Sequence, residues 1–261
     1  REEAIRINDL ARETLKIEIG ATNDLTWDII RNNARRKFYV ACKACTVCDG
    51  VECAGKVPGI GGIGTGSAFT ENLTALARYQ VNLRTIHGVK IPETSVELFG
   101  HKLAFPVLAA PITGMETNLA EGMDEREYAD AILDGCLECG TLGMVGDGAS
   151  PKKYLIGLEA IKKRGGLGIP IFKPREYNLD IIKRFKAAED AGAIAVGIDI
   201  DAASFKTMSL KGQAVGPKTI AELQELKSHV KVPFILKGIM NVESALAAIE
   251  AGADAIVVSN H

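Results

Sequence analysis

The chain has 261 residues, of which 47% are hydrophobic, and a formal net charge of −2 at pH 7. This length suits one large domain or two small ones with a sizeable core. The nearly balanced charge gives no electrostatic case for a nucleic acid or an anionic membrane as partner. We expect neither a membrane span nor a secretory signal, because no apolar run approaches the required length. Six cysteines in two tight groups favour a reducing compartment, and we expect a cytoplasmic protein.

Residues 1–95 are predicted to form a helical segment that differs in character from the rest of the chain. An apolar patch begins at Trp27. Thr70 is expected to cap a helix that carries Leu76 and Leu83 on one side and ends by Gly88. A stretch rich in cysteine and glycine lies between these two parts.

Four cysteines of this stretch have the spacing C-x2-C-x2-C-x4-C, at Cys42, Cys45, Cys48 and Cys53. Thiolates spaced this tightly suit an iron–sulfur cluster or zinc, although the run lacks the C-x3-C-P ending of bacterial ferredoxins. Free thiols and a redox disulfide are the alternatives. Cys136 and Cys139 form a second C-x2-C pair, which we interpret as core residues of a helix.

Gly59, Gly61 and Gly64 match the pattern G-x-G-x-x-G. No buried strand precedes them, and no βαβ unit with a following acidic residue surrounds them. The pattern therefore does not indicate dinucleotide binding. We interpret these glycines as positions where the chain turns tightly.

From residue 96 the sequence alternates short apolar strands with helices. Six strands are predicted, at Pro106–Pro111, Thr141–Gly146, Ile169–Lys173, Ala193–Asp199, Phe234–Lys237 and Ala255–Asn260. Helices are predicted between them, for example Glu125–Leu137 and Leu179–Asp190. Repeated βα units favour a parallel barrel or a doubly wound sheet. We predict an α/β fold, a (β/α)8 TIM barrel with about six units visible over residues 96–261, and we expect the remaining units beyond His261.

An internal repeat supports this reading. Residues 188–195 and 248–255 are similar in sequence at a spacing of 60 residues, and each copy ends a helix and opens a strand. In the helix that leads into the second copy, Asn241 is the expected N-cap, and Gly252 is the expected left-handed residue after the helix. The apolar stripe of this helix consists of Val242, Ala245, Leu246 and Ile249.

Two short motifs at strand ends make a specific match. Lys237-Gly238 closes one predicted strand, and Ser259-Asn260-His261 closes the next. With these motifs the chain resembles the FMN-dependent α-hydroxy-acid dehydrogenase and oxidase family, which includes glycolate and lactate oxidases. Phe99–Pro106, followed by Ala109–Pro111, resembles the family's first barrel strand and its entry. The similarity covers about residues 60 to 261.

The resemblance implies a set of roles. His261 would be the active-site base, Lys237 would lie near the pyrimidine edge of the flavin, and Ser259 would contact the ribityl chain. An arginine for the substrate carboxylate would follow His261 by three residues. The backbone along the flavin would be that of Ala110, Pro111, Ile112 and Thr113.

Some positions depart from the family pattern. The third strand commonly carries Gln and Tyr, where this chain has Ile171, Phe172 and Lys173, and Gly146 and Asp147 stand where serines are common. The positions expected to contact the flavin match the family pattern, whereas those expected to contact the substrate differ from it. The resemblance therefore implies FMN more firmly than it implies lactate or glycolate.

The side chains themselves support these roles. Polar residues at the carboxyl ends of parallel strands are where α/β proteins place active sites. The imidazole of His261 titrates near neutral pH and can accept a proton, and Lys237 can stabilise negative charge on a reduced flavin. Lys173 is either a phosphate or flavin contact or a solvated lysine. Asp199 and Asp201 either orient a polar network or cap a loop.

The leading hypothesis is an enzyme that oxidises a small 2-hydroxy acid to the 2-oxo acid with FMN. Oxygen or a protein carrier would accept the electrons, and the family implies a homo-oligomer. One alternative is another FMN-barrel activity, such as a type 2 isopentenyl-diphosphate isomerase. The other is a flavin- or cluster-binding module without hydroxy-acid turnover. An Arg shortly after His261 would favour the oxidase over this module.

Overall fold

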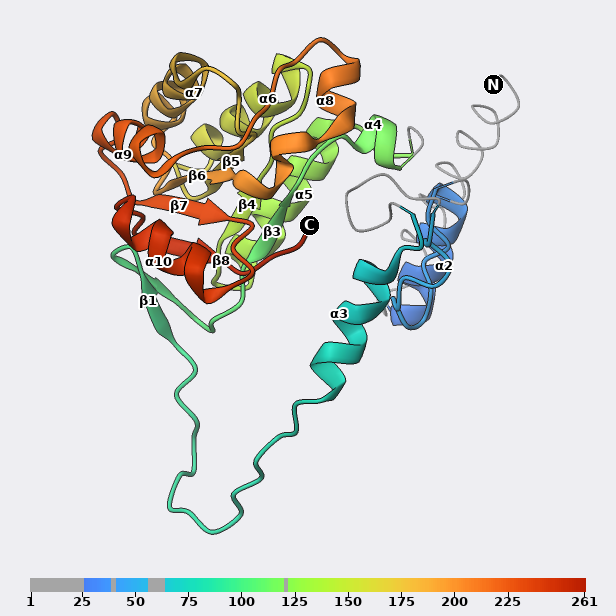
Figure 1. Cartoon of the computed structure of the whole chain (residues 1–261). Helices are drawn as coiled ribbons and strands as arrows, with labels where there is room; N and C mark the ends of the chain where they lie inside the picture. Colours follow the sequence, from blue (N-terminus) through green and yellow to red (C-terminus); the bar gives the residue numbers. More distant parts are fainter. Residues whose placement is uncertain (1–25, 39–40, 56–63, 120–121) are drawn as a thin grey trace. The chain divides into compact units, whose positions relative to one another are not determined.

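The computed structural model describes residues 26–38, 41–55, 64–119 and 122–261 (Figure 1). Val81–Thr113 together with Glu125–His261 form one compact unit, and the other described residues belong to a second. The division expected at residue 95 remains a prediction. Among the described helices, none combines the length and the apolar character needed to cross a membrane.

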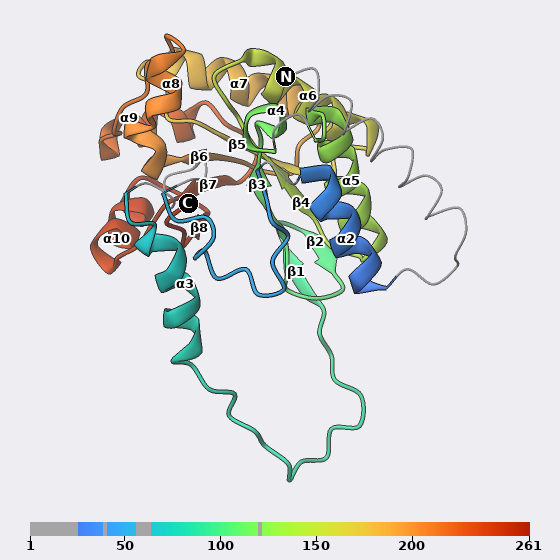
Figure 2. The same ribbon diagram turned by 90° about the vertical axis from the view of Figure 1, so that its right-hand side faces the viewer.

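The larger unit is built on six parallel strands, which neighbour one another in chain order. They are β3 (Ala109–Ile112), β4 (Gly143–Val145), β5 (Ile169–Phe172), β6 (Val196–Asp199), β7 (Phe234–Lys237) and β8 (Ala255–Val257). The sheet curls from β3 to β8 into a half-barrel (Figure 2). This confirms the predicted α/β barrel fold with six visible units.

Helices cover the outer face of this sheet (Figure 1). They are α5 (Glu125–Glu138), α6 (Pro151–Lys163), α7 (Asn178–Asp190), α9 (Ile220–Ser228) and α10 (Val242–Glu250). Local sequence explains where several begin. Pro151 occupies the first turn of α6. Thr219 and Glu222 form a capping box at α9, and Asn241 caps α10 by accepting a hydrogen bond from the Ser244 amide at 2.7 Å, as predicted.

The core has two layers because the strands β5, β6 and β7 are buried along their whole length. Between sheet and helices, the ring of Phe185 lies 6.0 Å from that of Phe172 and 5.8 Å from that of Phe234, centroid to centroid. On the concave face a second apolar cluster fills the interior of the half-barrel. It consists of Ile169, Ile171, Ala195 and Ile235.

The internal repeat is confirmed at the level of single hydrogen bonds. After α7, the amide of Ala193 donates to the carbonyl of Ala188 at 3.0 Å, and after α10 the amide of Ala253 donates to Ala248 at 3.0 Å. Gly192 and Gly252 adopt left-handed φ values of 81° and 82°. Each glycine lets the chain leave its helix and enter the next strand.

The short elements differ from the expectations. A β1 (Val96–Leu98) and β2 (His101–Leu103) hairpin precedes the barrel, turned by the positive φ of Phe99 and Gly100. The first barrel strand begins at Ala109, later than the expected Pro106. Phe99 and Leu108 pack against the interior cluster.

The smaller unit contains α2 (Trp27–Phe38), α3 (Ser67–Ala77) and α4 (Met115–Asn118). The prediction that Thr70 caps a helix is wrong. Gly66 is the N-cap of α3, and the Thr70 hydroxyl donates within the helix to the Ser67 carbonyl at 3.1 Å. The helix also ends well before Gly88. Residues 81–90 are exposed, so the predicted apolar side has no partner to bury it and no packing to extend the helix.

The apolar stripe predicted on α10 is largely exposed. Val242, Leu246 and Ile249 are 76%, 62% and 70% exposed, whereas Ala248 and Ala251 face the core. β8 is the last strand of the described sheet, so no further strand–helix unit of the described residues covers the outer side of α10. The small residues of the helix therefore pack inward, and the larger ones face outward.

After β6, the chain forms a 3-10 turn, η2 (Ile200–Ser204), and a short helix, α8 (Lys206–Leu210). The loop that follows α8 pairs back onto the segment after β5. The amide of Glu176 donates to Ala214 at 3.1 Å, and that of Gly216 donates to Pro174 at 3.0 Å. This places the loop at the carboxyl end of the sheet.

Candidate active site

Four consecutive strands bring charged side chains together at the carboxyl end of the half-barrel. Lys173 follows β5, Asp199 ends β6, Lys237 ends β7, and His261 follows β8. Asp201 joins them from η2. The two lysines and Asp199 are 93–95% buried, at 7%, 6% and 5% exposure. The cluster forms because the carboxyl ends of neighbouring parallel strands lie side by side.

Asp199 is the centre of this cluster. Its Oδ2 lies 2.6 Å from the Lys173 ammonium, and its Oδ1 lies 2.9 Å from the Lys237 ammonium. Burial opposes ionisation of this carboxyl. The hydrogen bond from His261 and the charges of the two lysines outweigh burial and hold the pKa of Asp199 well below its usual range. Asp199 is therefore a carboxylate throughout the physiological pH range.

His261 lies between two carboxylates. Its Nε2 is 3.1 Å from Oδ2 of Asp199, and its Nδ1 is 3.0 Å from Oδ2 of Asp201. Burial favours the neutral ring, but the hydrogen bonds to both carboxylates prevail and raise the pKa of His261. The backbone amide of His261 also donates to Oγ of Ser259 at 3.1 Å. These hydrogen bonds fix the orientation of the ring and favour its protonated form.

Two ammonium groups face the same imidazole. The Nζ of Lys173 lies 3.1 Å from Nε2, and the Nζ of Lys237 lies 3.4 Å from Nδ1. The Lys173 ammonium also lies 5.1 Å from the centre of the Phe205 ring. Each ring nitrogen of His261 therefore has one ammonium and one carboxylate as neighbours. With His261 protonated, the cluster carries three positive and two negative charges, which favours an anionic ligand.

A second ionic cluster, centred on Asp147, is joined to the first through the backbone of Lys173. Asp147, fully buried after β4, accepts a hydrogen bond from the Lys173 backbone amide at 3.2 Å. Its Oδ2 is also 2.9 Å from Nη2 of Arg175, and Arg184 approaches it to 3.6 Å. Arg175 reaches further to Oε1 of Gln213, at 2.6 Å. From the sequence, Asp147 is expected only as a departure from the family pattern, and neither Arg175 nor Arg184 is expected at the site.

The four residues expected along the flavin lie on or directly after β3, the other edge of the described sheet. Ala110 and Ile112 are exposed, and Pro111 is half-buried. The hydroxyl of Thr113 donates to Glu125.

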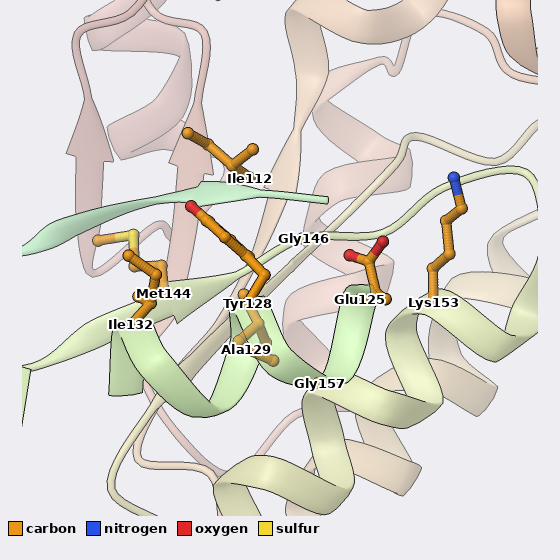
Figure 3. A pocket seen from close by; sticks show the side chains of 10 residues that line it. Ile112, Glu125, Tyr128, Ala129, Ile132, Met144, Gly146, Lys153 and Gly157 are labelled. Carbon is orange, nitrogen blue, oxygen red and sulfur yellow. The ribbon is translucent and has the colours of Figure 1, made fainter. Parts of the chain in front are cut away.

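A small pocket lies between β3, β4 and the helices α5 and α6 (Figure 3). Glu125 and Lys153 line it from facing helices, and the Tyr128 side chain reaches toward Ile112. Burial and the nearby Glu125 raise the pKa of Tyr128. None of the five residues of the charged cluster lines this pocket, so it is separate from the candidate active site.

The cysteines predicted as metal ligands all fall in described residues and are free thiols. Three of them are half-buried and Cys48 is exposed. Cys136, in α5, is half-buried, and Cys139 beyond it is exposed, so this pair is only partly a core feature. Of the glycine pattern, Gly59 and Gly61 lie outside the described residues, and Gly64 has a left-handed φ of 67°.

A curled parallel sheet with charged residues at its carboxyl end places the chain among α/β-barrel proteins. Comparison with known families goes further. The profile of the FMN-dependent dehydrogenase family matches residues 60–219 and 205–261, and the chain belongs to this family.

Individual relatives agree with this assignment. The chain is 28% identical over 240 residues to a 4-hydroxymandelate oxidase of Amycolatopsis orientalis, covering 77% of this chain and 63% of that protein. It is 27% identical to an L-lactate oxidase of Lactobacillus jensenii, covering 74% of this chain and 53% of the oxidase. The chain thus spans less than two thirds of the length of either relative.

Solved structures give the same picture. A structure of a mandelate oxidase variant with (S)-mandelic acid matches with a TM-score of 0.56 and 28% identity, over 73% of this chain and 58% of that one. The crystal structure of mandelate oxidase itself matches with a TM-score of 0.58 and 26% identity. The six-stranded half-barrel is therefore a partial TIM barrel like that of mandelate oxidase.

Proposed function

We propose that this protein binds FMN and oxidises a small 2-hydroxy acid to the corresponding 2-oxo acid. The observation that carries the proposal is His261, held between Asp199 and Asp201 at the carboxyl end of the sheet. A histidine in this setting can accept a proton and keep it, because both ring nitrogens meet a carboxylate. Membership of the FMN-dependent dehydrogenase family supports the choice of cofactor.

His261 is the base in this proposal. The neutral ring takes the proton of the substrate hydroxyl, and the resulting imidazolium is stabilised by Asp199 and Asp201. The substrate loses the hydrogen on its α-carbon together with two electrons, and the carbon–oxygen single bond becomes a carbonyl. When bound, FMN supplies the acceptor for those two electrons. The orientation of His261 is set in part by its amide hydrogen bond to Ser259.

The two lysines would stabilise the negative charges of the cofactor and the substrate. Lys237, buried beside Asp199, would stabilise negative charge on the flavin, and Lys173 would contact the cofactor or the substrate anion. With His261 neutral, the two ammonium groups balance the two carboxylates. Once His261 has taken the substrate proton, the cluster gains one positive charge, which the carboxylate of a 2-hydroxy acid would offset.

The residues present also fit a flat cofactor at the other edge. β3 is the first strand of the described sheet, and its residues are accessible at that edge. Ala110, Pro111, Ile112 and Thr113 are the residues that the family resemblance assigns to the flavin, together with Lys237 and Ser259. Ala110 and Ile112 remain exposed, which leaves room for a ligand there.

The test combines flavin spectroscopy with one variant. Anaerobically purified protein should show the two visible flavin bands, and these should bleach when the right 2-hydroxy acid from a panel is added. His261→Gln should keep the flavin bands but bleach about 10²- to 10⁴-fold more slowly. His229→Gln is the matched control, because His229 is exposed at the end of α9.

Each outcome has a clear meaning. Bands that never bleach would favour the isomerase or the binding-module alternative, and an absence of flavin bands would count against FMN. Normal turnover in His261→Gln would remove His261 as the base.

The remaining partners follow from the same proposal. Oxygen or a protein carrier reoxidises the flavin. Oxygen uptake by the substrate-reduced protein would indicate oxygen as the acceptor, and its absence would indicate a carrier. We also propose a cytoplasmic homo-oligomer. Cell fractionation and light scattering test these two points, and a peroxisomal location deserves comparison because a relative from Arabidopsis thaliana is a peroxisomal (S)-2-hydroxyacid oxidase.

A further inference from the structure

Phe205 lies against the candidate active site although it belongs to none of the strands. It follows η2 and is the N-cap of α8, and the centre of its ring is 5.1 Å from the Lys173 ammonium. The same ring lies 6.4 Å from that of His261, centroid to centroid, with an angle of 42° between the two planes. The residue is half-buried. An apolar group that is still accessible therefore lies beside the proposed base.

Backbone hydrogen bonds on both sides fix the position of Phe205. Its amide donates to the carbonyl of Ala202 at 3.1 Å, and its carbonyl accepts from the amide of Met208 at 3.0 Å. The carbonyl of Met208 in turn accepts from the amide of Gln213 at 2.9 Å. Ala202 and Met208 are both fully buried. Phe205 therefore begins an element that is packed against the rest of the larger unit.

A second anchor ties this element to the segment that carries Lys173. Oε1 of Gln213 accepts a hydrogen bond from Nη1 of Arg175 at 2.6 Å, and the backbones of Arg175 and Val215 form an antiparallel bridge. Lys173 and Arg175 lie on the same segment after β5, so the ring of Phe205 and the ammonium of Lys173 are fixed relative to each other. A ligand that uses this ring therefore pays little for ordering it.

We propose that Phe205 determines substrate specificity by contacting the substituent on the α-carbon of the substrate, and that the substrates are 2-hydroxy acids with an apolar side chain. This inference rests on the proposed function. For His261 to accept the proton of the substrate hydroxyl, that hydroxyl must lie within about 3 Å of the imidazole. The α-carbon is one bond further, so its side chain comes within reach of the ring of Phe205.

The chemistry of the ring decides which side chains are favoured. Phe205 offers an apolar surface and no hydrogen-bonding atom, so it favours an aliphatic or aromatic side chain. A carboxylate side chain would lose water there without a hydrogen bond in return. The ammonium of Lys173 beside the ring does not supply that partner freely, because it already pairs with Asp199 at 2.6 Å. The site should therefore prefer phenyllactate to lactate and disfavour malate.

The experiment measures kcat/KM of the full-length flavin-loaded protein for glycolate, lactate, phenyllactate and malate. Wild type should prefer phenyllactate to lactate by about 10-fold or more. Phe205→Ala should lower this ratio by about 10-fold, whereas Phe205→Leu keeps an apolar surface and should retain most of it. Leu210→Ala is the matched control, because Leu210 is 76% exposed in the same short helix and should leave the ratio unchanged. A ratio of two acids cancels effects on His261 that act on both alike.

A second measurement does not depend on turnover. Phenylpyruvate and pyruvate carry the same two side chains, and their dissociation constants follow from their effect on the flavin bands. Phe205→Ala should weaken phenylpyruvate binding by about 10-fold and change pyruvate binding less. A wild-type preference for glycolate or malate, or an unchanged ratio in Phe205→Ala, would overturn the inference. Flavin bands that no 2-hydroxy acid bleaches would instead reject the proposed function, and this inference with it.

Discussion

Nε2 of His261 lies 3.1 Å from the ammonium of Lys173 and also 3.1 Å from the carboxylate Oδ2 of Asp199. A lysine ammonium can only donate, and a carboxylate can only accept. Nε2 must therefore be unprotonated to bond Lys173 and protonated to bond Asp199. The protonation of His261 is decided by the balance between these two neighbours.

Lys173→Met should raise the pKa of His261 beyond its already raised value. The change removes a positive charge that opposes the imidazolium, and it leaves Asp199 with one ammonium fewer. We expect the titration midpoint of the His261 ring, followed by NMR, to rise. If His261 is the base, the acid limb of the activity profile should move to higher pH by the same amount.

The control for this variant is Lys186→Met, which removes an exposed ammonium paired with Asp190 on α7. It should leave the His261 midpoint in place. A midpoint that stays constant or falls in Lys173→Met would show that Lys173 does not oppose protonation of His261.

Asp199→Asn should destabilise the fold at pH 7 by about 3 kcal/mol, because it leaves two buried ammonium groups without their counter-ion. The folded-state pKa of Asp199 is lowered, so its contribution is present above its unfolded value, about 3.9, and is lost as pH falls through the folded value. Urea unfolding at neutral pH and near pH 3 should thus show a smaller difference between wild type and variant in acid. An equal difference at both pH values would contradict this account.

His261 contributes to stability in the opposite direction. Its folded-state pKa is raised, so its contribution is full below the unfolded value, about 6.5, and disappears as pH rises through the folded value. His261→Gln should therefore cost more stability in mild acid than in mild alkali. The free energy of unfolding across this pH window, compared with that of His229→Gln, measures the effect.

Gly238→Ala should disturb the candidate active site without replacing a charged residue. Gly238 has φ of 102°, and a Cβ there would lie 2.6 Å from Cγ of Asp201. Displacing Asp201 weakens its hydrogen bond to Nδ1, so the pKa of His261 should fall while stability drops by about 2 kcal/mol or more. Gly212→Ala is the control, because Gly212 also has positive φ but nothing lies within 4 Å of its added Cβ. Equal effects of both variants would point to backbone strain alone.

Arg175→Met should leave the carboxylate of Asp147 buried with too little positive charge. Arg175 is 3% exposed and also donates to the Gly148 carbonyl at 2.7 Å. Loss of such a buried partner costs about 3–5 kcal/mol in chemical denaturation. Arg126→Met removes an exposed ion pair of 2.6 Å and should cost at most about 1 kcal/mol. Similar costs for the two variants would contradict the importance of burial here.

The helix ends at Asn241 and Gly252 could be predicted from the sequence, because they depend only on residues close by in the chain. Asn241 caps its helix and Gly252 ends it because each acts on backbone groups three or four residues away. Thr70 has the same capping chemistry as Asn241, yet it lies inside α3. The difference arises because Gly66 turns the chain earlier, where a close approach to Ala54 leaves no room for a Cβ.

The candidate site could be predicted only in part. Strand ends indicated Lys173, Asp199 and His261 one by one, because each follows an apolar run. Their pairing joins residues 26 to 88 positions apart and depends on the order of strands in the sheet. Arg175 and Arg184 carried no signal in the sequence, since a loop arginine and a helix arginine are usually solvated. Their burial follows from Asp147, which lies on a third segment.

The two ammonium groups on one carboxylate also act on the assembly of the sheet. Asp199 joins Lys173 and Lys237, so the ends of β5, β6 and β7 are tied together by charge. A slip of β6 by one residue would turn Asp199 toward the helices and present Ile198 or Ile200 to two buried cations. Such a misaligned sheet would be strongly unfavourable. The residues proposed for catalysis therefore also favour the correct strand register. A sheet with β6 out of register loses the ion pairs of Asp199 and is destabilised.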